Sequence, residues 1–226
     1  MIRLPDVDQL AGEINSELVA LPSRTAETMR AIRRQYSRRL AAAKSDFVVR
    51  LALRLLGQSD PLCRYLAYEL ISYHRPAFES LGPDQLLRLG QGLDSWSAVD
   101  CFAYYLSGPT WREGRLPGAV IRDWTQSADR WWRRAALVST VALSRRGTVD
   151  DVRRTVETCA ALIFDRDDMV VKALSWALRE LGKKHPEEAR RFLANHQRIL
   201  AARVIREVEN KLTTGLKNPR RRVERS

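Results

Sequence analysis

Apolar residues return with a helical period almost everywhere along the chain, and this regularity restricts the fold more than any other feature. Between residues 134 and 143, and again between 171 and 181, apolar side chains recur every three or four positions and so lie on one face of an α-helix. No stretch bounded by turn signals alternates apolar and polar residues. The pattern therefore predicts an all-α chain without strands, built from roughly ten helices of about 10 to 18 residues joined by short loops.

The helical segments also repeat. Segments with similar apolar patterns begin at Arg64, Asp100, Arg134, Lys172 and Arg203, at spacings of 36, 34, 38 and 31 residues. A helical hairpin that cannot bury its apolar face alone can bury it against the next hairpin. The period therefore predicts a superhelical α-α solenoid of stacked helical hairpins with no β-sheet. A compact helical bundle without repeats is the alternative.

Residues that favour helix ends stand where the apolar period changes. Helix starts are expected at Asp60-Pro61, Ser95, Asp129, Thr148 and His185-Pro186, because each offers a capping side chain or a proline for the first turn. Helices are expected over residues 96–106, 130–145 and 149–164. Ser107-Gly108-Pro109 should end the first of these and Gly147 the second.

The chain is expected to hold one domain and a tail. Residues 1–216 should form a single helical-repeat domain. Residues 217–226, KNPRRRVERS, carry five basic residues and one acidic residue. Such a segment cannot bury an apolar core, so we expect a basic disordered tail. It could add nonspecific affinity for phosphates, or it could simply be solvated.

The charge balance points to a polyanionic partner. Lys and Arg number 39 against 27 Asp and Glu, which gives a formal net charge of +12 at pH 7. An excess of this sign and size favours nucleic acid as the first partner to consider.

The sequence lacks the motifs of secreted disulfide-bonded proteins, membrane proteins, metal sites and nucleotide-binding proteins. Cys63, Cys101 and Cys159 are odd in number and widely spaced, so we expect no disulfide framework and a reducing, cytoplasmic compartment. The amino terminus lacks the pattern of a signal peptide, and no apolar run of about 18 residues predicts a membrane span. The histidines show no metal-ligand spacing, and glycine-rich phosphate loops and nucleophile elbows are missing from the sequence. We therefore expect no metal, no cofactor and no membrane partner.

The first residue of each repeat predicts a surface property. This residue is basic in four repeats and is Asp100 in the remaining one. Because stacked repeats place equivalent positions side by side, the phase predicts a basic stripe interrupted by one carboxylate. Ordinary solvated helix starts are the alternative.

One constellation of residues could carry chemistry. Trp96 and Asp100 lie four residues apart on a predicted helix and therefore share a face, and Trp176 follows Lys172 at the same spacing. If equivalent phases face one groove, Trp96, Asp100, Arg134 and Trp176 line a single surface. Tryptophans at helical spacing are more often core residues, and a single Asp is more often a surface charge. Trp111 and Trp124 are interpreted as packing or rim residues, and at least one of the adjacent Trp131 and Trp132 as structural.

This constellation suits the cleavage of an N-glycosidic bond. Positive charge builds on the sugar as the base departs, and a carboxylate beside the sugar can stabilise that charge and orient a water molecule. Indole rings offer π faces to a cationic sugar or to a cationic alkylated base. An arginine can hold a backbone phosphate with two hydrogen bonds. The reaction needs no metal.

At these residues the chain resembles a known family. The stretches SWSAVD (95–100), WRRAAL (132–137) and VKALSWALRE (171–180) are similar to the bacterial DNA alkylation-repair glycosylases built from HEAT-like helical repeats. The resemblance covers roughly residues 60 to 215. The earlier segment TAETMRAIRRQYSRRL (25–40) is similar in character, without a matching motif. Some members have two Trp before the Asp, and here Ser95 fills the earlier position.

The resemblance implies an activity and assigns residues to it. The family removes N3- and N7-alkylated purines, which carry a positive charge, and its best-known members leave the base stacked instead of flipping it. By resemblance, Asp100 is the catalytic aspartate, Trp96 and Trp176 are the groove tryptophans, and Arg134 is the arginine that precedes Ala-Ala. Certain relatives keep the fold, lack the catalytic set and bind unusual DNA structures.

The sequence thus predicts a monofunctional DNA-alkylpurine glycosylase, expected to be a monomer that acts on double-stranded DNA containing alkylated purines, in the cytoplasm and on the nucleoid. Asp100 would stabilise the sugar cation and position water, while Trp96 and Trp176 would hold the deoxyribose. The residues expected to meet phosphates are Arg64, Arg133, Arg134, Lys172, Arg179 and Arg203. The alternatives are a noncatalytic binder of damaged or branched DNA on the same fold and a helical-repeat scaffold for protein partners.

Overall fold

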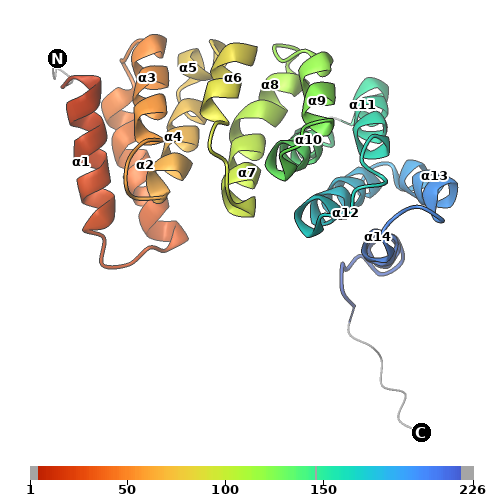
Figure 1. Ribbon diagram of the computed structural model, residues 1–226. Coiled ribbons are helices and arrows are strands. Elements are labelled where there is room, and N and C mark those ends of the chain that lie inside the picture. The colour runs from red at the N-terminus through yellow and green to blue at the C-terminus, as the bar shows by residue number, and fades with distance from the viewer. Residues whose placement is uncertain (1–4, 146, 220–226) are drawn as a thin grey trace, which may run out of the picture. The chain divides into compact units, whose positions relative to one another are not determined.

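The computed structural model describes residues 5–145 and 147–219, and these residues are helical or lie in short connections (Figure 1). No strand occurs in the described part of the chain, so the predicted all-α class is confirmed. The chain divides into two compact units between Leu116 and Pro117. Each unit is described by itself below.

The first unit consists of α1 (Val7–Val19), α2 (Ala26–Leu40), α3 (Ser45–Leu55), α4 (Leu62–Ser72), α5 (Arg75–Glu79), α6 (Pro83–Leu89), α7 (Trp96–Phe102), the π-helix η1 (Ala103–Ser107) and α8 (Gly108–Arg112). Helix α4 packs against α2 on one side and against α7 and η1 on the other. Helix α3 packs against α1, α4, α5 and α6. The helix that carries Asp100 therefore rests directly on α4.

A buried tyrosine links the layers of the first unit. The Tyr68 ring meets the Phe102 ring edge-on at 5.7 Å between centroids. Its hydroxyl donates to the Leu89 carbonyl oxygen at 2.8 Å and accepts from Arg64 Nη1 at 2.9 Å. Because Tyr68 is fully buried, these bonds satisfy a hydroxyl that would otherwise be costly in the core.

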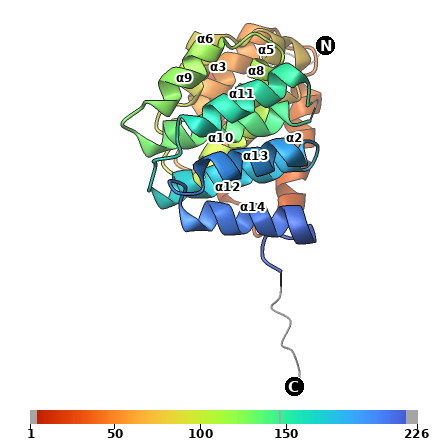
Figure 2. The same cartoon turned by 90° about the vertical axis from the view of Figure 1, so that its right-hand side faces the viewer.

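The second unit consists of α9 (Gly118–Thr125), α10 (Arg130–Leu143), α11 (Val149–Ala160), α12 (Asp168–Gly182), α13 (Pro186–His196) and α14 (Ala202–Thr214). Helix α12 packs between α10 and α14, and α11 and α13 cover this row (Figure 2). The repeat starts Arg134, Lys172 and Arg203 fall on α10, α12 and α14, as the period predicts.

The predicted helix starts are confirmed where capping side chains act locally. Thr148 accepts from the Asp151 amide at 3.1 Å, Asp129 from the Trp131 amide at 2.8 Å and Ser95 from the Ala98 amide at 3.4 Å. Before α4, Asp60 Oδ1 accepts from the Leu62 amide at 2.9 Å. Each cap satisfies an amide that has no partner within its helix.

The predicted helix over residues 96–106 is wrong at its end. Helix α7 passes into η1, and α8 continues directly from it, so Ser107-Gly108-Pro109 does not stop the chain. The Gly108 amide bonds to the Ala103 carbonyl oxygen, the spacing of a π-turn. Pro109 lies in the first turn of α8 and has no N–H, so residue 109 donates no hydrogen bond back into η1.

The expected number and length of helices are also wrong. The described residues contain fourteen α-helices, several of only five to eight residues. Proline in the first turn divides α5 and α6 from their neighbours. Where the expected tail begins, the Asn210 side chain donates to the Lys217 carbonyl oxygen at 3.1 Å. Residues 220–226, most of that expected tail, lie outside the described residues.

A buried carboxylate joins α12 to α14. Glu207 on α14 is buried, and its Oε2 accepts from the Ser175 hydroxyl of α12 at 2.6 Å. Lys217 Nζ lies 3.4 Å from Glu207 Oε1. Because a buried carboxylate requires partners, this cluster holds the last two helices of the row in register.

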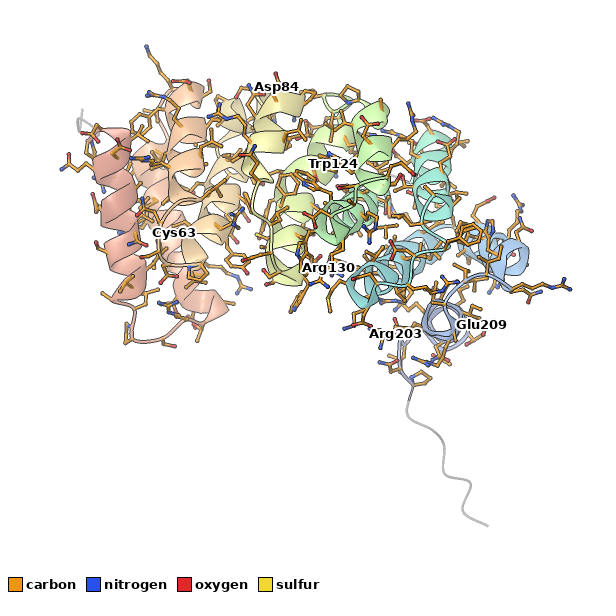
Figure 3. All side chains as sticks on the ribbon, in the orientation of Figure 1. Cys63, Asp84, Trp124, Arg130, Arg203 and Glu209 are labelled. Carbon is orange, nitrogen blue, oxygen red and sulfur yellow. The ribbon has the colours of Figure 1, made fainter. Side chains whose placement is uncertain are left out.

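We expect Glu207→Ala to lower the free energy of unfolding by about 2–4 kcal/mol, because it leaves the buried Ser175 hydroxyl without its acceptor and opens space between α12 and α14. The measurement is a urea titration followed by circular dichroism. Glu209→Ala, on the exposed face of the same helix (Figure 3), is the control and should change stability by less than about 0.5 kcal/mol. Equal losses in both variants would contradict the assigned role.

Candidate active site and DNA interface

Helix α7 presents Trp96 and Asp100 on its accessible side. Ser95 caps the helix, and Trp96 follows as its first residue with 57% of its surface exposed. Asp100, one turn later, is partly exposed. Val99 and Phe102 are fully buried, so the packed side of the helix is the one that the sequence predicted. The pair therefore lies at a surface that a ligand can reach.

Sequence reasoning missed an aromatic residue in the same row. Tyr104 follows Asp100 by four residues, and 41% of its surface is exposed. In an α-helix, four residues overshoot one full turn by about 40°. The π-turn of η1 takes more residues per turn and so removes part of that overshoot. We therefore expect Tyr104 to lie on the same row of the helix as Asp100. The signal was present in the sequence as W-x-x-x-D-x-x-x-Y.

The adjacent row of this helix is tied to α4 at two points. The Tyr65 and Ser97 hydroxyls are 2.8 Å apart and share a hydrogen bond. Two turns further on, the Tyr105 hydroxyl donates to Glu69 Oε1 at 3.0 Å. Tyr65 and Glu69 are four residues apart on α4 and therefore share a face. Asp100 lies between the two ties, so α4 fixes the position of the backbone that carries it.

The surroundings of Asp100 hold a second carboxylate, Glu69. Arg33 Nε of α2 lies 3.9 Å from Glu69 Oε2, and the same guanidinium stacks on the Tyr73 ring at 3.8 Å from its centroid. Burial, followed by the charges of Glu69 and Asp100, raises the pKa of the Cys101 thiol. The thiol is therefore neutral, and Glu69 and Asp100 both act on it through their charges.

Some of the tryptophans pack inside the protein, and others are accessible at its surface. Trp132 packs on Trp124 at 4.8 Å between ring centroids. Trp124 is buried, as is Trp111 of the first unit, so the packing interpretation of both is confirmed. Trp131 carries the Arg130 guanidinium over its ring at 4.7 Å. Trp176 on α12 is partly exposed.

The two predicted arginines of α10 have partners within the protein. Arg133 Nε donates to Asp165 Oδ2 at 2.7 Å, and its Nη1 donates to the carbonyl oxygens of Ser127 and Ala128, each at 2.9 Å. Arg134 is buried, and its Nη1 donates to the Met169 carbonyl oxygen of α12. Both side chains therefore connect α10 to the residues that lead into α12.

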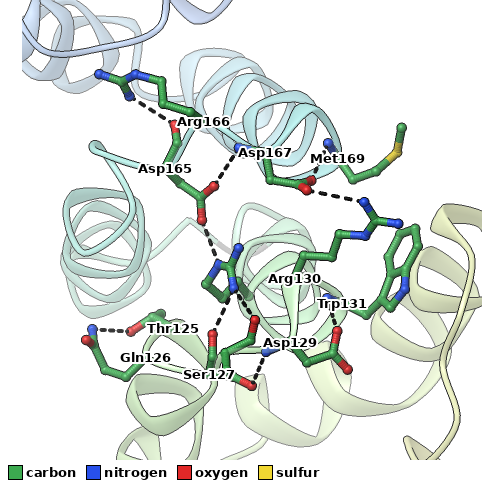
Figure 4. A network of polar contacts seen from close by, with 12 residues as sticks. Thr125, Gln126, Ser127, Asp129, Arg130, Trp131, Asp165, Arg166, Asp167 and Met169 are labelled. Atoms are coloured by element: carbon green, nitrogen blue, oxygen red, sulfur yellow. Dashed lines mark hydrogen bonds and ion pairs between the residues drawn. The ribbon is translucent and has the colours of Figure 1, made fainter.

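Acidic residues between α11 and α12, here called the acidic segment (residues 165–168), pair with other predicted DNA contacts. Lys172 and Arg203 both bind Asp168, each at 2.6 Å. Arg130 lies 3.3 Å from Asp167 Oδ2, and Figure 4 shows this pair beside Asp165. The hydrogen bond from Lys172, together with the charge of Arg203, lowers the pKa of Asp168. A phosphate that binds these cations has to replace a carboxylate.

Arg64 and Arg179 also have internal partners. Arg64 Nη1 donates to the Tyr68 hydroxyl at 2.9 Å and to the Gln91 carbonyl oxygen at 3.1 Å. Arg179 Nε donates to the Ser175 hydroxyl at 3.2 Å, and burial lowers the pKa of its guanidinium. A guanidinium has several N–H donors, so one internal bond leaves others for a phosphate.

The predicted residues divide between the units. Arg64, Trp96 and Asp100 belong to the first, while Arg134 and Trp176 belong to the second. That Trp96, Asp100, Arg134 and Trp176 line one surface stays a prediction. In residues 5–145 and 147–219, no three His, Cys, Asp or Glu side chains cluster closely enough to hold a metal ion. No helix in those ranges is long and apolar enough to cross a membrane.

Comparison with known proteins places the chain among relatives. The family model described as DNA alkylation repair enzyme matches residues 24–212. The crystal structure of AlkD2 from Streptococcus mutans superposes with a TM-score of 0.67 and 16% identity, covering 94% of this chain and 100% of that one. At this identity the likeness shows a shared helical-repeat fold. A comparison with curated proteins gave no match.

We expect Asp168→Asn to raise affinity for undamaged duplex DNA by on the order of three- to tenfold at moderate salt, because it frees Lys172 and Arg203 for phosphates. The slope of log K against log salt concentration should steepen by about 1 to 2. Asp150→Asn is the control, since Asp150 pairs with Arg153 within its own helix. If both variants bind DNA like the wild type, neither cation of the Asp168 cluster contacts phosphate.

Proposed function

The chain belongs to the family of DNA alkylation repair enzymes, and from this premise we propose that it is a monofunctional DNA glycosylase. Its substrate would be double-stranded DNA that contains purines alkylated at N3 or N7. The observation that carries the proposal is the row formed by Trp96, Asp100 and Tyr104, because it combines one carboxylate with two accessible aromatic rings. The chain would act as a monomer.

Asp100 acts on the bond between the sugar and the damaged base. An alkylated purine is cationic, and it leaves as a neutral base when it takes the electron pair of the N-glycosidic bond. The positive charge then lies on the sugar, where the Asp100 carboxylate stabilises it. Water adds to C1′ of the sugar and gives its proton to Asp100, which later returns it to solvent. The products are the free base and an abasic site.

Aromatic rings support the same step. Trp96 and Tyr104 flank Asp100 along one row and offer π faces to a cationic base or sugar. Trp176 is assigned to the deoxyribose, where it would exclude solvent. Contacts of these rings and of Asp100 with the deoxyribose do not require the damaged base to leave the base stack. We therefore propose that the base is not flipped. Base flipping is the usual route in other glycosylases.

The cations hold the DNA backbone without reading sequence. Lys172 and Arg203 exchange Asp168 for phosphate, which makes their binding dependent on salt. Arg64, Arg133 and Arg179 combine internal hydrogen bonds with a phosphate contact through further N–H groups. Arg134 is buried and holds α10 against α12 through its hydrogen bond to Met169. Contacts of this kind position a duplex and leave discrimination to the lesion's own charge.

We expect Asp100→Asn to slow the release of 7-methylguanine or 3-methyladenine from methylated duplex DNA by at least about 100-fold in single-turnover assays, because the sugar cation loses its counter-charge. Asp94→Asn is the matched control, an exposed acid two residues before Trp96, and should stay within about twofold of the wild type. A rate for Asp100→Asn within about twofold would remove this residue from the chemistry.

Assays of the wild-type protein also test the two alternative functions, a noncatalytic DNA binder and a scaffold for protein partners. Salt-sensitive DNA binding with no base release at any protein concentration would favour a noncatalytic binder of damaged or branched DNA. Binding that plain duplex DNA does not compete away would favour a scaffold for protein partners.

We expect Tyr104→Ala to weaken binding to duplex DNA carrying a cationic abasic-sugar analogue by about 3- to 10-fold relative to a neutral abasic analogue, since it removes one π face from the site. Tyr104→Phe keeps the face and should retain most of the preference. Phe164→Ala, another exposed aromatic, is the control. Identical preferences in Tyr104→Ala and the wild type would exclude Tyr104 from the site.

A further inference from the structure

Helix α2 carries more arginines than its packing uses. It contains Arg30, Arg33, Arg34, Arg38 and Arg39. Arg33 pairs with Glu69 and stacks on Tyr73, and Arg39 pairs with Glu13 of α1. Two of the five arginines thus connect α2 to the helices on either side of it. The remaining three contribute nothing visible to the packing of the unit.

These three arginines form a row on the exposed face. Arg30, Arg34 and Arg38 are each exposed, and each follows the last by four residues, so they lie along one side of the helix. The opposite side, formed by Ile32, Tyr36 and Leu40, is buried. Within the described residues, no carboxylate lies within ion-pair distance of any member of the row. We call Arg30, Arg34 and Arg38 the α2 arginine row.

Such a row is unfavourable for the free protein. Like charges four residues apart repel each other on a helix, and α2 has only one acidic residue, Glu27 in its first turn. Two carboxylates of α1 that contact α2 are occupied by other partners, because Glu13 binds Arg39 and Glu17 accepts hydrogen bonds from Gln35 and Tyr36. The repulsion is therefore not relieved inside the unit. An external polyanion would relieve it.

We propose that the α2 arginine row binds consecutive phosphates of one strand of duplex DNA and so forms a second, lesion-independent anchor in the first unit. The row extends about 12 Å along the helix axis, from a rise of about 1.5 Å per residue. One DNA strand presents a phosphate about every 3.4 Å of its axis but winds around that axis, so its neighbouring phosphates lie farther apart than the axial rise. The three arginines can therefore meet at most about three consecutive phosphates. Guanidinium groups match phosphate oxygens with paired hydrogen bonds.

The α2 arginine row differs from Lys172 and Arg203 of the second unit in what must be displaced before a phosphate can bind. Lys172 and Arg203 must first release Asp168. The α2 row has no carboxylate to release, so each phosphate contact adds its full counterion-release contribution. The inference rests on the proposed function only in taking duplex DNA as the polyanion.

The test compares two triple variants with the same loss of charge. Arg30→Gln, Arg34→Gln and Arg38→Gln are combined in one protein. Arg153→Gln, Arg190→Gln and Arg191→Gln are combined in the control, since these exposed arginines each pair with an acid on their own helix. Binding to an undamaged duplex is measured over a range of salt concentrations. A third protein, with lysine at the three α2 positions, keeps the charge and reports on folding.

The row variant should lose about 2 to 3 units from the slope of log K against log salt, at about 0.9 per phosphate contact. The lysine variant should keep the slope, and the control triple should stay within about 0.5 of the wild type. A row variant with the slope of the control overturns the proposal. A row that governs binding to phosphatidylserine vesicles and leaves DNA binding unchanged overturns it as well.

Base release by the wild type is scored separately, so the two proposals fail independently. A wild type that releases no alkylated base, combined with a slope that falls in the row variant, rejects the glycosylase and keeps the anchor. A wild type that releases base, combined with an unchanged slope, rejects only the anchor.

Discussion

The attachment of α7 and η1 to α4 is the constraint on which the proposed site depends. Two hydrogen bonds make this attachment, one between Tyr65 and Ser97 and one from Tyr105 to Glu69. They fix one row of the helix against α4 and thereby turn the neighbouring row, with Trp96 and Asp100, toward solvent. The π-turn belongs to the same arrangement, because it contains Tyr105, whose hydroxyl donates to Glu69. This support fixes the position of the backbone from which the Asp100 side chain would meet the reacting sugar. A loosely held side chain would spend less time in the reactive geometry, and the rate of base release would fall.

Carboxylates are distributed unevenly over a strongly basic chain, and this distribution separates two modes of DNA contact. The acidic segment neutralises cations on α10, α12 and α14, so contact there is an exchange of one anion for another. The α2 arginine row has no such counter-charge within the described residues. Net charge alone would have treated all of these arginines as equivalent. Their partners make them different, because a guanidinium that already holds a carboxylate gains less from a phosphate.

The sequence predicted the helix starts well, because they depend on nearby residues. It did not predict features that depend on packing, such as the end of the helix that carries Asp100. Thr148 and Asp129 cap helices as expected, because a capping side chain needs only the amides two or three residues away. Ser107-Gly108-Pro109 reads locally as a stop, yet the chain continues into α8 through a π-turn. Within this turn Tyr105 donates to Glu69, which is 36 residues away, so the contact exists only once the helices have packed. The repeat starts fall on α10, α12 and α14 as the period predicts, but Arg134 is buried instead of lining a surface stripe. Packing also brings Arg203 to Asp168, 35 residues away in the sequence.

The sequence by itself determined the all-α class, the period of the repeats and the spacing of Trp96 and Asp100 on one helical face, because each of these follows from the pitch of a helix and from residues close together in the chain. Tertiary structure alone decided the partners of charged side chains that pair with residues far away in the chain. Arg133 and Arg134 lie beside each other in the sequence, and their partners Asp165 and Met169 stand 32 and 35 residues further on. Such partners are chosen when helices pack, since only packing determines which distant side chains come within reach.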